Sequence, residues 1–351
     1  MEIKRENYTV KISEPILYVD NKSRKRSGHM THALAEWAPG KLIDFNSNCT
    51  AEKYGGHSTF GWVEYRLSDD GGETYSEIHE LPYSKKSLYD GIYVISVEKA
   101  VACDDGRIVA ICLRNDADSL CQPWDTPMTV TSFDGGKTWT EEKELCSYKG
   151  RVYDALYHDG IIYILEFCND GTGCFCGESE EHVYRIFTSH DNGGTFNELC
   201  IVPIPSLGRG YGSMLFDAEG KLHVYAYNKD NEQYIDHIVS TDCGASWKEA
   251  EVCYVKHGLR NPQVAQIDNI YIAHGRSAAL TGFVLYTSED GQTWDEGTFI
   301  ADEKGSCYYS NNIVLKDTDG KNRMLIQYSE KYGRDECVNV KHVWLTIEKN
   351  I

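Results

Sequence analysis

The sequence predicts an all-β protein that folds as one six-bladed β-propeller over residues 1–351. Three observations support this prediction: a short motif occurs five times, its copies start 64, 57, 51 and 48 residues apart, and alternating apolar residues flank each copy. Alternation with a period of two is typical of β-strands, and a repeat of this length is typical of four-stranded sheets arranged radially. At roughly 150 residues per domain the length would suggest two domains, but the repeat favours one.

The repeated motif has the pattern S-x-D-x-G-x-T-aromatic. In the fourth copy Ser replaces Thr, and the fifth copy is one residue shorter. Ser and Asp side chains bond nearby backbone amides, glycine supplies a positive φ, and the aromatic residue starts the next strand, so each copy predicts a tight turn. The five copies, called boxes below, occupy residues 68–75, 132–139, 189–196, 240–247 and 288–294.

Each box follows three predicted strands, so that one repeat makes one antiparallel sheet. In the first repeat these strands cover residues 32–37, 41–45 and 61–67, with a turn at Pro39 and Gly40. A sixth unit, at residues 312–315, 323–327 and 342–346, has no box and ends one strand short. We expect the N-terminal stretch, residues 8–12 to 16–19, to supply this strand and close the ring, because closure removes an exposed sheet edge.

The composition excludes several classes of protein. The net charge is −19 and 41% of the residues are apolar, which predicts a real core but argues against a nucleic-acid or anionic-membrane partner. Residues 1–10 show no apolar signal segment, and the 13 cysteines are scattered, so we expect reduced thiols and a cytoplasmic location. Cys174 and Cys176 lack the usual two-residue spacer of a zinc site. We expect neither a metal nor another cofactor.

Five boxes at this spacing resemble the Asp-box (bacterial neuraminidase repeat) superfamily, which sialidases typify. The segment from Tyr309 to Leu315 resembles the family's Y-S-x-L-x-V-L segment, whose Tyr is the nucleophile, and Arg276 resembles the last carboxylate-binding Arg. A planar guanidinium suits a carboxylate because it makes two parallel hydrogen bonds. The resemblance implies an exo-acting glycoside hydrolase that removes a terminal, anionic sugar from a glycan or oligosaccharide.

Other parts of the family pattern are missing. Met30-Thr31-His32 stands where sialidases carry Arg-Ile-Pro, and no acid lies near Tyr211, where the family's Glu activates the nucleophile. The segment that starts at Arg260 resembles the N-E-x-Q-V pattern but has Asn in place of Glu. One hypothesis is that an Arg set is rebuilt from different blades, by Arg209, Arg260 and Arg276.

Polar residues near the predicted inner strands supply the remaining candidates. His57 lies in the loop where the resemblance places the acid/base Asp, and a histidine can move a proton near pH 7. His32 and Asp154 start inner strands, where an unpaired buried charge would be costly, so we expect them to act in proton transfer. Glu98 and Glu166 are further acid/base candidates. Candidates for contacting the carbohydrate are His29, Tyr211, Arg114 and Asp116.

Two other functions fit the same fold. In the first, a lyase or a histidine-dependent glycosidase uses His29, His32 and His57 for catalysis or to hold a metal, which the missing Arg and Glu favour. In the second, the propeller binds a glycan or a protein without catalysis. Fold alone does not decide between them.

Overall fold

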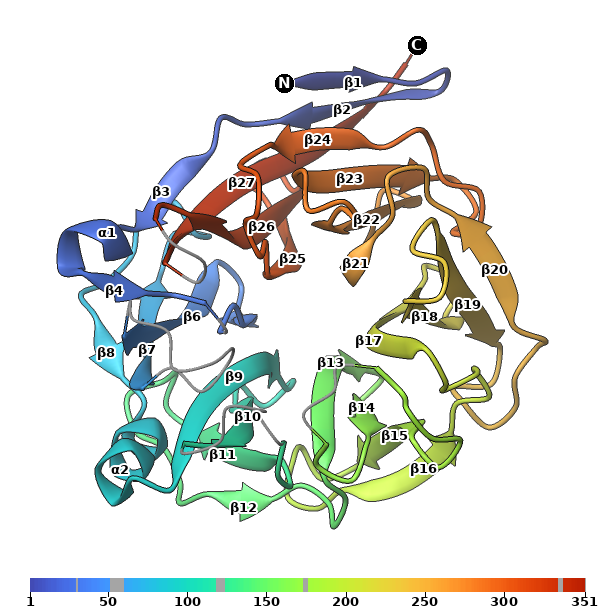
Figure 1. Ribbon diagram of the computed structural model, residues 1–351. Helices are drawn as coiled ribbons and strands as arrows, with labels where there is room; N and C mark the ends of the chain where they lie inside the picture. Colours follow the sequence, from blue (N-terminus) through green and yellow to red (C-terminus); the bar gives the residue numbers. More distant parts are fainter. Residues whose placement is uncertain (30, 51–59, 118–123, 173–175, 334–336, 351) are drawn as a thin grey trace.

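The computed structural model describes residues 1–29, 31–50, 60–117, 124–172, 176–333 and 337–350. Six antiparallel sheets surround a central axis, and the strands β9, β13, β17, β21 and β25 face that axis (Figure 1). The fold is therefore the predicted six-bladed β-propeller. No helix within these residues is long and apolar enough to cross a membrane.

The first five blades follow the chain in order. Blade 1 contains β4 (Arg26–Ser27), β5 (Leu34–Ala38), β6 (Lys41–Thr50), β7 (Gly61–Ser68) and β8 (His79–Glu80). Blade 2 contains β9 (Tyr93–Ala102), β10 (Ile108–Asp116), β11 (Met128–Ser132) and β12 (Lys143–Glu144). Blade 3 contains β13 (Gly150–His158), β14 (Ile161–Cys168), β15 (Val183–Ser189) and β16 (Asn197–Ile201).

Blade 4 contains β17 (Arg209–Phe216), β18 (Leu222–Asn228), β19 (Tyr234–Ser240) and β20 (Glu251–Tyr254). Blade 5 contains β21 (Arg260–Ile267), β22 (Ile270–Arg276), β23 (Phe283–Ser288) and β24 (Thr298–Ala301). Two short helices, α1 (Asn21–Arg24) and α2 (Pro82–Asp90), lie outside the sheets.

The sixth blade joins the two ends of the chain. It contains β25 (Ser310–Lys316), β26 (Asn322–Lys331) and β27 (Val338–Lys349), and then β2 (Tyr8–Ile12) and β1 (Glu2–Lys4) from the N-terminus. β2 pairs with β27 over five residues, and β3 (Ile16–Val19) pairs with the same strand. The prediction that N-terminal residues close the last blade is confirmed, and closure leaves β27 paired on both sides (Figure 1).

The boxes link neighbouring blades. In the second box, Ser132 Oγ accepts a hydrogen bond from Gly136 N at 2.8 Å, and Asp134 accepts one from Thr138 N at 2.9 Å. The turn then reaches the preceding blade, where Tyr65 Oη donates to Gly136 O at 2.6 Å and accepts from the indole of Trp139 at 3.1 Å. The box therefore fixes the packing of one blade on the next, far from the central axis.

Candidate functional site

A β-bulge interrupts the innermost strand in several consecutive blades. Glu98 in β9, Tyr153 in β13 and Tyr211 in β17 are each left without a partner on the neighbouring strand. In β21 two residues, Asn261 and Pro262, occupy the equivalent place. A bulge breaks the alternation of side chains and re-aims the residue that bulges. Consecutive residues of one strand can therefore both point toward the channel, at different levels.

Arg151 lies at the centre of the group that the bulges assemble. It is 1% exposed, and its Nη2 donates to both carboxylate oxygens of Glu98, at 2.8 and 3.1 Å. Its guanidinium carbon lies 5.0 to 5.5 Å from the ring centroids of Trp124, Tyr153, Tyr211 and Tyr309. Cation–π attraction is strongest when the cation is desolvated, so these rings stabilise the buried charge.

Two further arginines face the same rings from blade 5. Arg260 and Arg276 stand opposite each other on β21 and β22. The Arg260 guanidinium carbon lies 5.8 Å from the Tyr211 ring centroid, and that of Arg276 lies 5.9 Å from the Tyr309 ring centroid. Like charges directly across a strand pair repel. The two positive charges therefore favour a negatively charged group beside them, although the net charge of the whole protein is −19.

Tyr211 and Tyr309 meet between these arginines, and their hydroxyl oxygens are 3.4 Å apart. Tyr309 directly precedes β25, and its backbone is held by Ser329, whose Oγ accepts from Tyr309 N at 3.0 Å. Tyr211 sits on its bulge with φ of 27°. A bulky residue at positive φ is strained, and such strain concentrates at functional positions. We call Arg151, Arg260, Arg276, Tyr211 and Tyr309 the arginine–tyrosine cluster.

The cluster separates the acidities of its two phenols. Burial raises the pKa of Tyr309 well above its ordinary value, and the neighbouring Tyr211 raises it further. Burial also opposes ionisation of Tyr211, but the charges of Arg276, Arg260 and Arg151 and the hydrogen bond from Tyr309 outweigh it and lower the pKa of Tyr211. Two interacting groups in contact titrate as a pair. In this pair Tyr211 loses its proton first.

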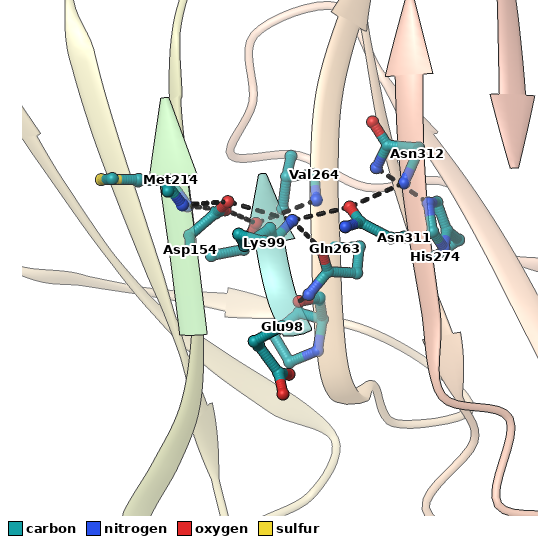
Figure 2. Close-up of polar contacts among 12 residues, drawn as sticks. Glu98, Lys99, Asp154, Met214, Gln263, Val264, His274, Asn311 and Asn312 are labelled. Carbon is teal, nitrogen blue, oxygen red and sulfur yellow. Dashed lines mark hydrogen bonds and ion pairs between the residues drawn. The ribbon is translucent and has the colours of Figure 1, made fainter. Parts of the chain in front are cut away.

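A second polar group crosses the channel one step further along the strands. Lys99 Nζ donates to Gln263 Oε1 at 2.6 Å and Asn311 Oδ1 at 2.7 Å, and pairs with Asp154 Oδ1 at 3.0 Å (Figure 2). Asp154 Oδ2 also accepts from Ser213 Oγ and from Met214 N, each at 2.8 Å. Side chains from blades 2 to 6 thus meet at one buried cation. We call Lys99, Asp154, Ser213, Gln263 and Asn311 the lysine belt.

Beyond the lysine belt the channel opens again. A cavity of about 460 Å³ is lined by residues that follow the belt along the inner strands, among them Ala100, Ala155, Val264 and Ile313. The belt therefore lies between this cavity and the arginine–tyrosine cluster. The cavity walls combine alanine and aliphatic side chains with polar ones, among them Glu36, His158, Gln266 and Asn312.

The structure brings together five of the predicted site residues. Tyr309, Arg276, Arg260 and Tyr211 form the cluster described above, and His29 contacts it, with its ring edge-on to Tyr309 at a centroid distance of 5.0 Å. We required Arg276 and Tyr309 to lie within about 10 Å for a shared substrate, and the observed 5.9 Å meets this condition.

Two predicted proton carriers must be corrected. Asp154 is 2% exposed and accepts four hydrogen bonds or ion pairs in and beside the lysine belt. The bulge at Tyr153 turns the Asp154 side chain toward this belt and away from the arginine–tyrosine cluster. His32 lies between blades, with its Nδ1 at 3.1 Å from Gln327 Oε1 and its Nε2 at 3.2 Å from His29 O. Burial lowers the pKa of His32 to about 4. Both residues are structural in this arrangement.

Three predicted substrate contacts lie elsewhere. Arg209 pairs with Asp236 at 2.5 Å and Asp230 at 3.2 Å. Arg114 donates to Thr126 O at 2.8 Å and lines a small cavity beside α2 instead of the channel. Asp116 is exposed at the end of β10. Arg209 lies on β17, and Arg114 and Asp116 lie on β10. His57 lies outside the described residues.

Sequence reasoning missed Arg151 and Lys99. Both lie on innermost strands of the structure, β13 and β9; Arg151 precedes the predicted strand that starts at Asp154, and Lys99 is adjacent to Glu98. Glu98 was expected to be an acid or base, but both its oxygens bond Arg151. A buried charge requires a partner of opposite charge. The sequence signal that could have identified Arg151 and Lys99 was therefore a charged residue on a strand that the fold must bury.

The metal-dependent alternative finds no support in the described histidines. Among the residues that the structure describes, no three His, Cys, Asp or Glu side chains are grouped so that they could hold a metal ion. Of the three predicted histidines, only His29 among those described contacts the arginine–tyrosine cluster. Glu166, another candidate, is fully buried in blade 3 beside Cys146, and burial raises its pKa to about 7.

Comparison with known proteins agrees with this architecture. The family model for the BNR/Asp-box repeat matches residues 130–141, which contain the second box. No curated protein sequence matches significantly. A protein of unknown function from Dyadobacter fermentans is similar in structure, with a TM-score of 0.73 and 15% identity over 97% of this chain and 99% of that chain.

Two sialidases are also similar. A variant of the NanB sialidase from Streptococcus pneumoniae has a TM-score of 0.67 and 11% identity over 95% of this chain and 70% of that chain. The intramolecular trans-sialidase from Ruminococcus gnavus, solved with oseltamivir carboxylate, has a TM-score of 0.62 and 11% identity over 93% and 96%. At such identities the likeness concerns the fold. The chain therefore has the six-bladed propeller fold of these sialidases, with a BNR/Asp-box repeat matched at residues 130–141.

Proposed function

We propose that this protein is a glycoside hydrolase that removes a terminal, anionic sugar from a glycan or oligosaccharide. The observation that carries the proposal is the convergence of Tyr309 with Arg260 and Arg276 in the arginine–tyrosine cluster. Catalysis requires the reacting group and the binding groups to touch one substrate. The similar solved sialidases support a carbohydrate as that substrate.

In the proposed reaction Arg260 and Arg276 hold the anionic group of the sugar. Arg276 makes no salt bridge with any residue that the structure describes, and its buried Nε has no hydrogen-bond partner among them. A guanidinium in this state gains most from a carboxylate that makes two parallel bonds. Arg151 plays a different part, because Glu98 already pairs with it.

Tyr309 Oη then attacks the anomeric carbon, and the glycosidic C–O bond breaks. The leaving oxygen takes a proton from His57, which keeps its predicted role as part of this proposal, and water later releases the sugar from Tyr309. The transition state has oxocarbenium character. A phenol needs activation because its ordinary pKa is near 10, and the positive charges of Arg151 and Arg276 provide part of it.

The test is a panel of chromogenic glycosides whose terminal sugars carry a carboxylate, with neutral sugars as the comparison. We expect turnover of an anionic member, loss of at least about 100-fold in kcat in Tyr309→Phe, and a large rise in KM in Arg276→Met. Tyr89→Phe is the matched control, since Tyr89 is 80% exposed on α2. Binding of an anionic sugar without turnover of any glycoside would instead support the non-catalytic alternative, and full activity of Tyr309→Phe would refute the assignment.

A further inference from the structure

A phenolic nucleophile needs a group that takes its proton, and the described part of the cluster places a second phenol in that position. Tyr211 Oη is 3.4 Å from Tyr309 Oη. Glu98 does not serve, because Arg151 occupies both of its oxygens. We infer that Tyr211 is held as a phenolate and is the base that accepts the proton of Tyr309. This inference rests on the proposed function and assigns a further catalytic residue to it.

The charges around Tyr211 support the phenolate. Three guanidinium groups approach its ring or hydroxyl, from β13, β21 and β22, and Glu98 pairs with one of them, that of Arg151. Positive charge close to a phenol favours its ionised form over its neutral form. Ionising Tyr211 places a negative charge beside these guanidinium groups without bringing in another residue. A carboxylate substrate would then bind Arg260 and Arg276, as proposed above.

Three further tyrosines near Tyr211 favour their neutral form. Tyr153 on β13 and Tyr227 on β18 lie 5.5 and 5.9 Å from its ring centroid, and Tyr184 on β15 bonds the preceding carbonyl of Gly210. Burial raises the pKa of Tyr153, Tyr227 and Tyr184. None of them competes with Tyr211 for ionisation. Among the residues that the structure describes, the charged and titratable groups near Tyr211 include Arg151 with its partner Glu98, Arg260, Arg276, Tyr153, Tyr184, Tyr227 and Tyr309.

The bulge in β17 sets the position from which the Tyr211 side chain extends. Tyr211 is the residue that bulges out of β17, and Tyr184 Oη donates to Gly210 O at 2.7 Å beside it. Gly212 follows directly, and a Cβ there would lie 2.9 Å from Leu165 Cδ2, so the strand is pressed against blade 3. These contacts hold the backbone beside Tyr211, whose hydroxyl lies 3.4 Å from that of Tyr309.

The proton balance closes over the cycle. As Tyr309 Oη bonds the anomeric carbon, its proton passes to the Tyr211 phenolate, which becomes a neutral phenol. In the second step water bonds the anomeric carbon and gives one proton to His57, which had protonated the leaving oxygen. The bond from the sugar to Tyr309 breaks, and Tyr309 departs as a phenolate that recovers its proton from Tyr211. The Tyr211 phenolate is then restored, and no oxidant, reductant or cofactor takes part.

The first experiment detects the charge of the Tyr211 phenol directly and needs no substrate. Tyrosine labelled with ¹³C at Cζ is incorporated, and the folded protein is examined by NMR between about pH 6 and pH 9, a range below the ordinary phenol pKa. We expect one tyrosinate resonance in the wild type, its retention in Tyr309→Phe, and its loss in Tyr211→Phe. A wild-type spectrum without tyrosinate, or a tyrosinate that disappears only in Tyr309→Phe, would overturn the inference.

The second experiment tests whether Tyr211 acts as the base for Tyr309. Tyr211→Phe should lower kcat by about 10²- to 10⁴-fold, the usual worth of a general base, with little change in the affinity for an unreactive anionic sugar. Tyr211→Glu should recover part of the rate. Fluorotyrosine at position 211, a more acidic phenol, should move the rising limb of kcat/KM to lower pH. Unchanged turnover and an unchanged pH profile in Tyr211→Phe would refute the base role.

The two proposals fail in different ways. If the wild type turns over no glycoside but shows the Tyr211 tyrosinate, the hydrolase assignment and the base role fall, and the ionised phenol remains as part of an anion-binding site. If a glycoside is turned over and Tyr211→Phe is fully active, the hydrolase assignment stands and the base role is wrong.

Discussion

Removing the positive charge of the lysine belt should destabilise the whole propeller. In Lys99→Met the side chain keeps a similar length but loses its ammonium group, and with it the ion pair to Asp154 at 3.0 Å and the hydrogen bonds to Gln263 and Asn311. The Asp154 side chain is 3% exposed, so water cannot replace the lost partner. Breaking a buried ion pair by removing one partner costs about 3–5 kcal/mol.

The Gln263 amide oxygen that loses its donor adds to this cost, whereas Asn311 Oδ1 keeps the hydrogen bond from Asn312 N at 2.8 Å. A buried acceptor without a partner costs about 1–3 kcal/mol, although an amide that turns over recovers part of it. We therefore expect a loss of about 4–6 kcal/mol in the free energy of unfolding, a large share of the about 5–15 kcal/mol that holds typical domains together. The measurement is urea unfolding near pH 7, followed by two spectroscopic probes.

The double variant Lys99→Met with Asp154→Asn tests the cause. It removes the stranded negative charge, so it should recover at least about 2 kcal/mol over Lys99→Met, and it provides a folded protein if the single variant does not accumulate. Lys11→Met is the control, because its pair with Glu348 is exposed and should leave stability unchanged. A loss below about 1 kcal/mol in Lys99→Met, or no recovery in the double variant, would refute the reasoning.

Two further predictions concern pH and backbone conformation. Burial, with the charge of Lys99, lowers the pKa of His274 from 6.5 to about 3. Because the pKa is lower in the folded state than in the unfolded state, the stability that neutral His274 contributes is present above pH 6.5. It is lost as the pH falls toward 3, by about 1.4 kcal/mol per pH unit. Urea unfolding at several pH values should therefore show a shallower acid loss in His274→Gln, and an identical slope would contradict the assignment. Gly258 has φ of +71°, and a Cβ there would lie 2.4 Å from Ala278 Cβ, whereas Gly160 has φ of +79° and open space around it. Gly160→Ala should cost about 1–2 kcal/mol for the left-handed backbone alone, and Gly258→Ala at least about 1 kcal/mol more; equal losses in thermal or urea unfolding would show that the contact does not matter.

Much of the fold could be predicted because it depends on local patterns. The box sequence specifies its own turn through bonds between residues four apart, such as Ser132 Oγ with Gly136 N and Asp134 with Thr138 N. Repetition of that turn specifies the blades, and their count leaves one strand to be found at the N-terminus. These inferences need only residues that are close in the sequence.

The candidate site could be predicted only in part. Tyr309 and Arg276 were found through motif resemblance, and the structure places them together. Asp154 and His32 were assigned to proton transfer because they begin inner strands, but a bulge turns the first into the lysine belt and the second lies against Gln327. Bulges arise from the register between two strands, and a single strand's sequence does not reveal them.

The sequence by itself determined the blade repeat, the closing strand and the residue types available to the channel, because strand alternation and turn chemistry act over a few residues. Tertiary structure decided which charges meet. Arg151 with Glu98, Lys99 with Asp154, and Tyr211 with Tyr309 join residues from different blades, 53, 55 and 98 positions apart. Electrostatic energy depends on distance and burial, and both are set only when six sheets close around one axis.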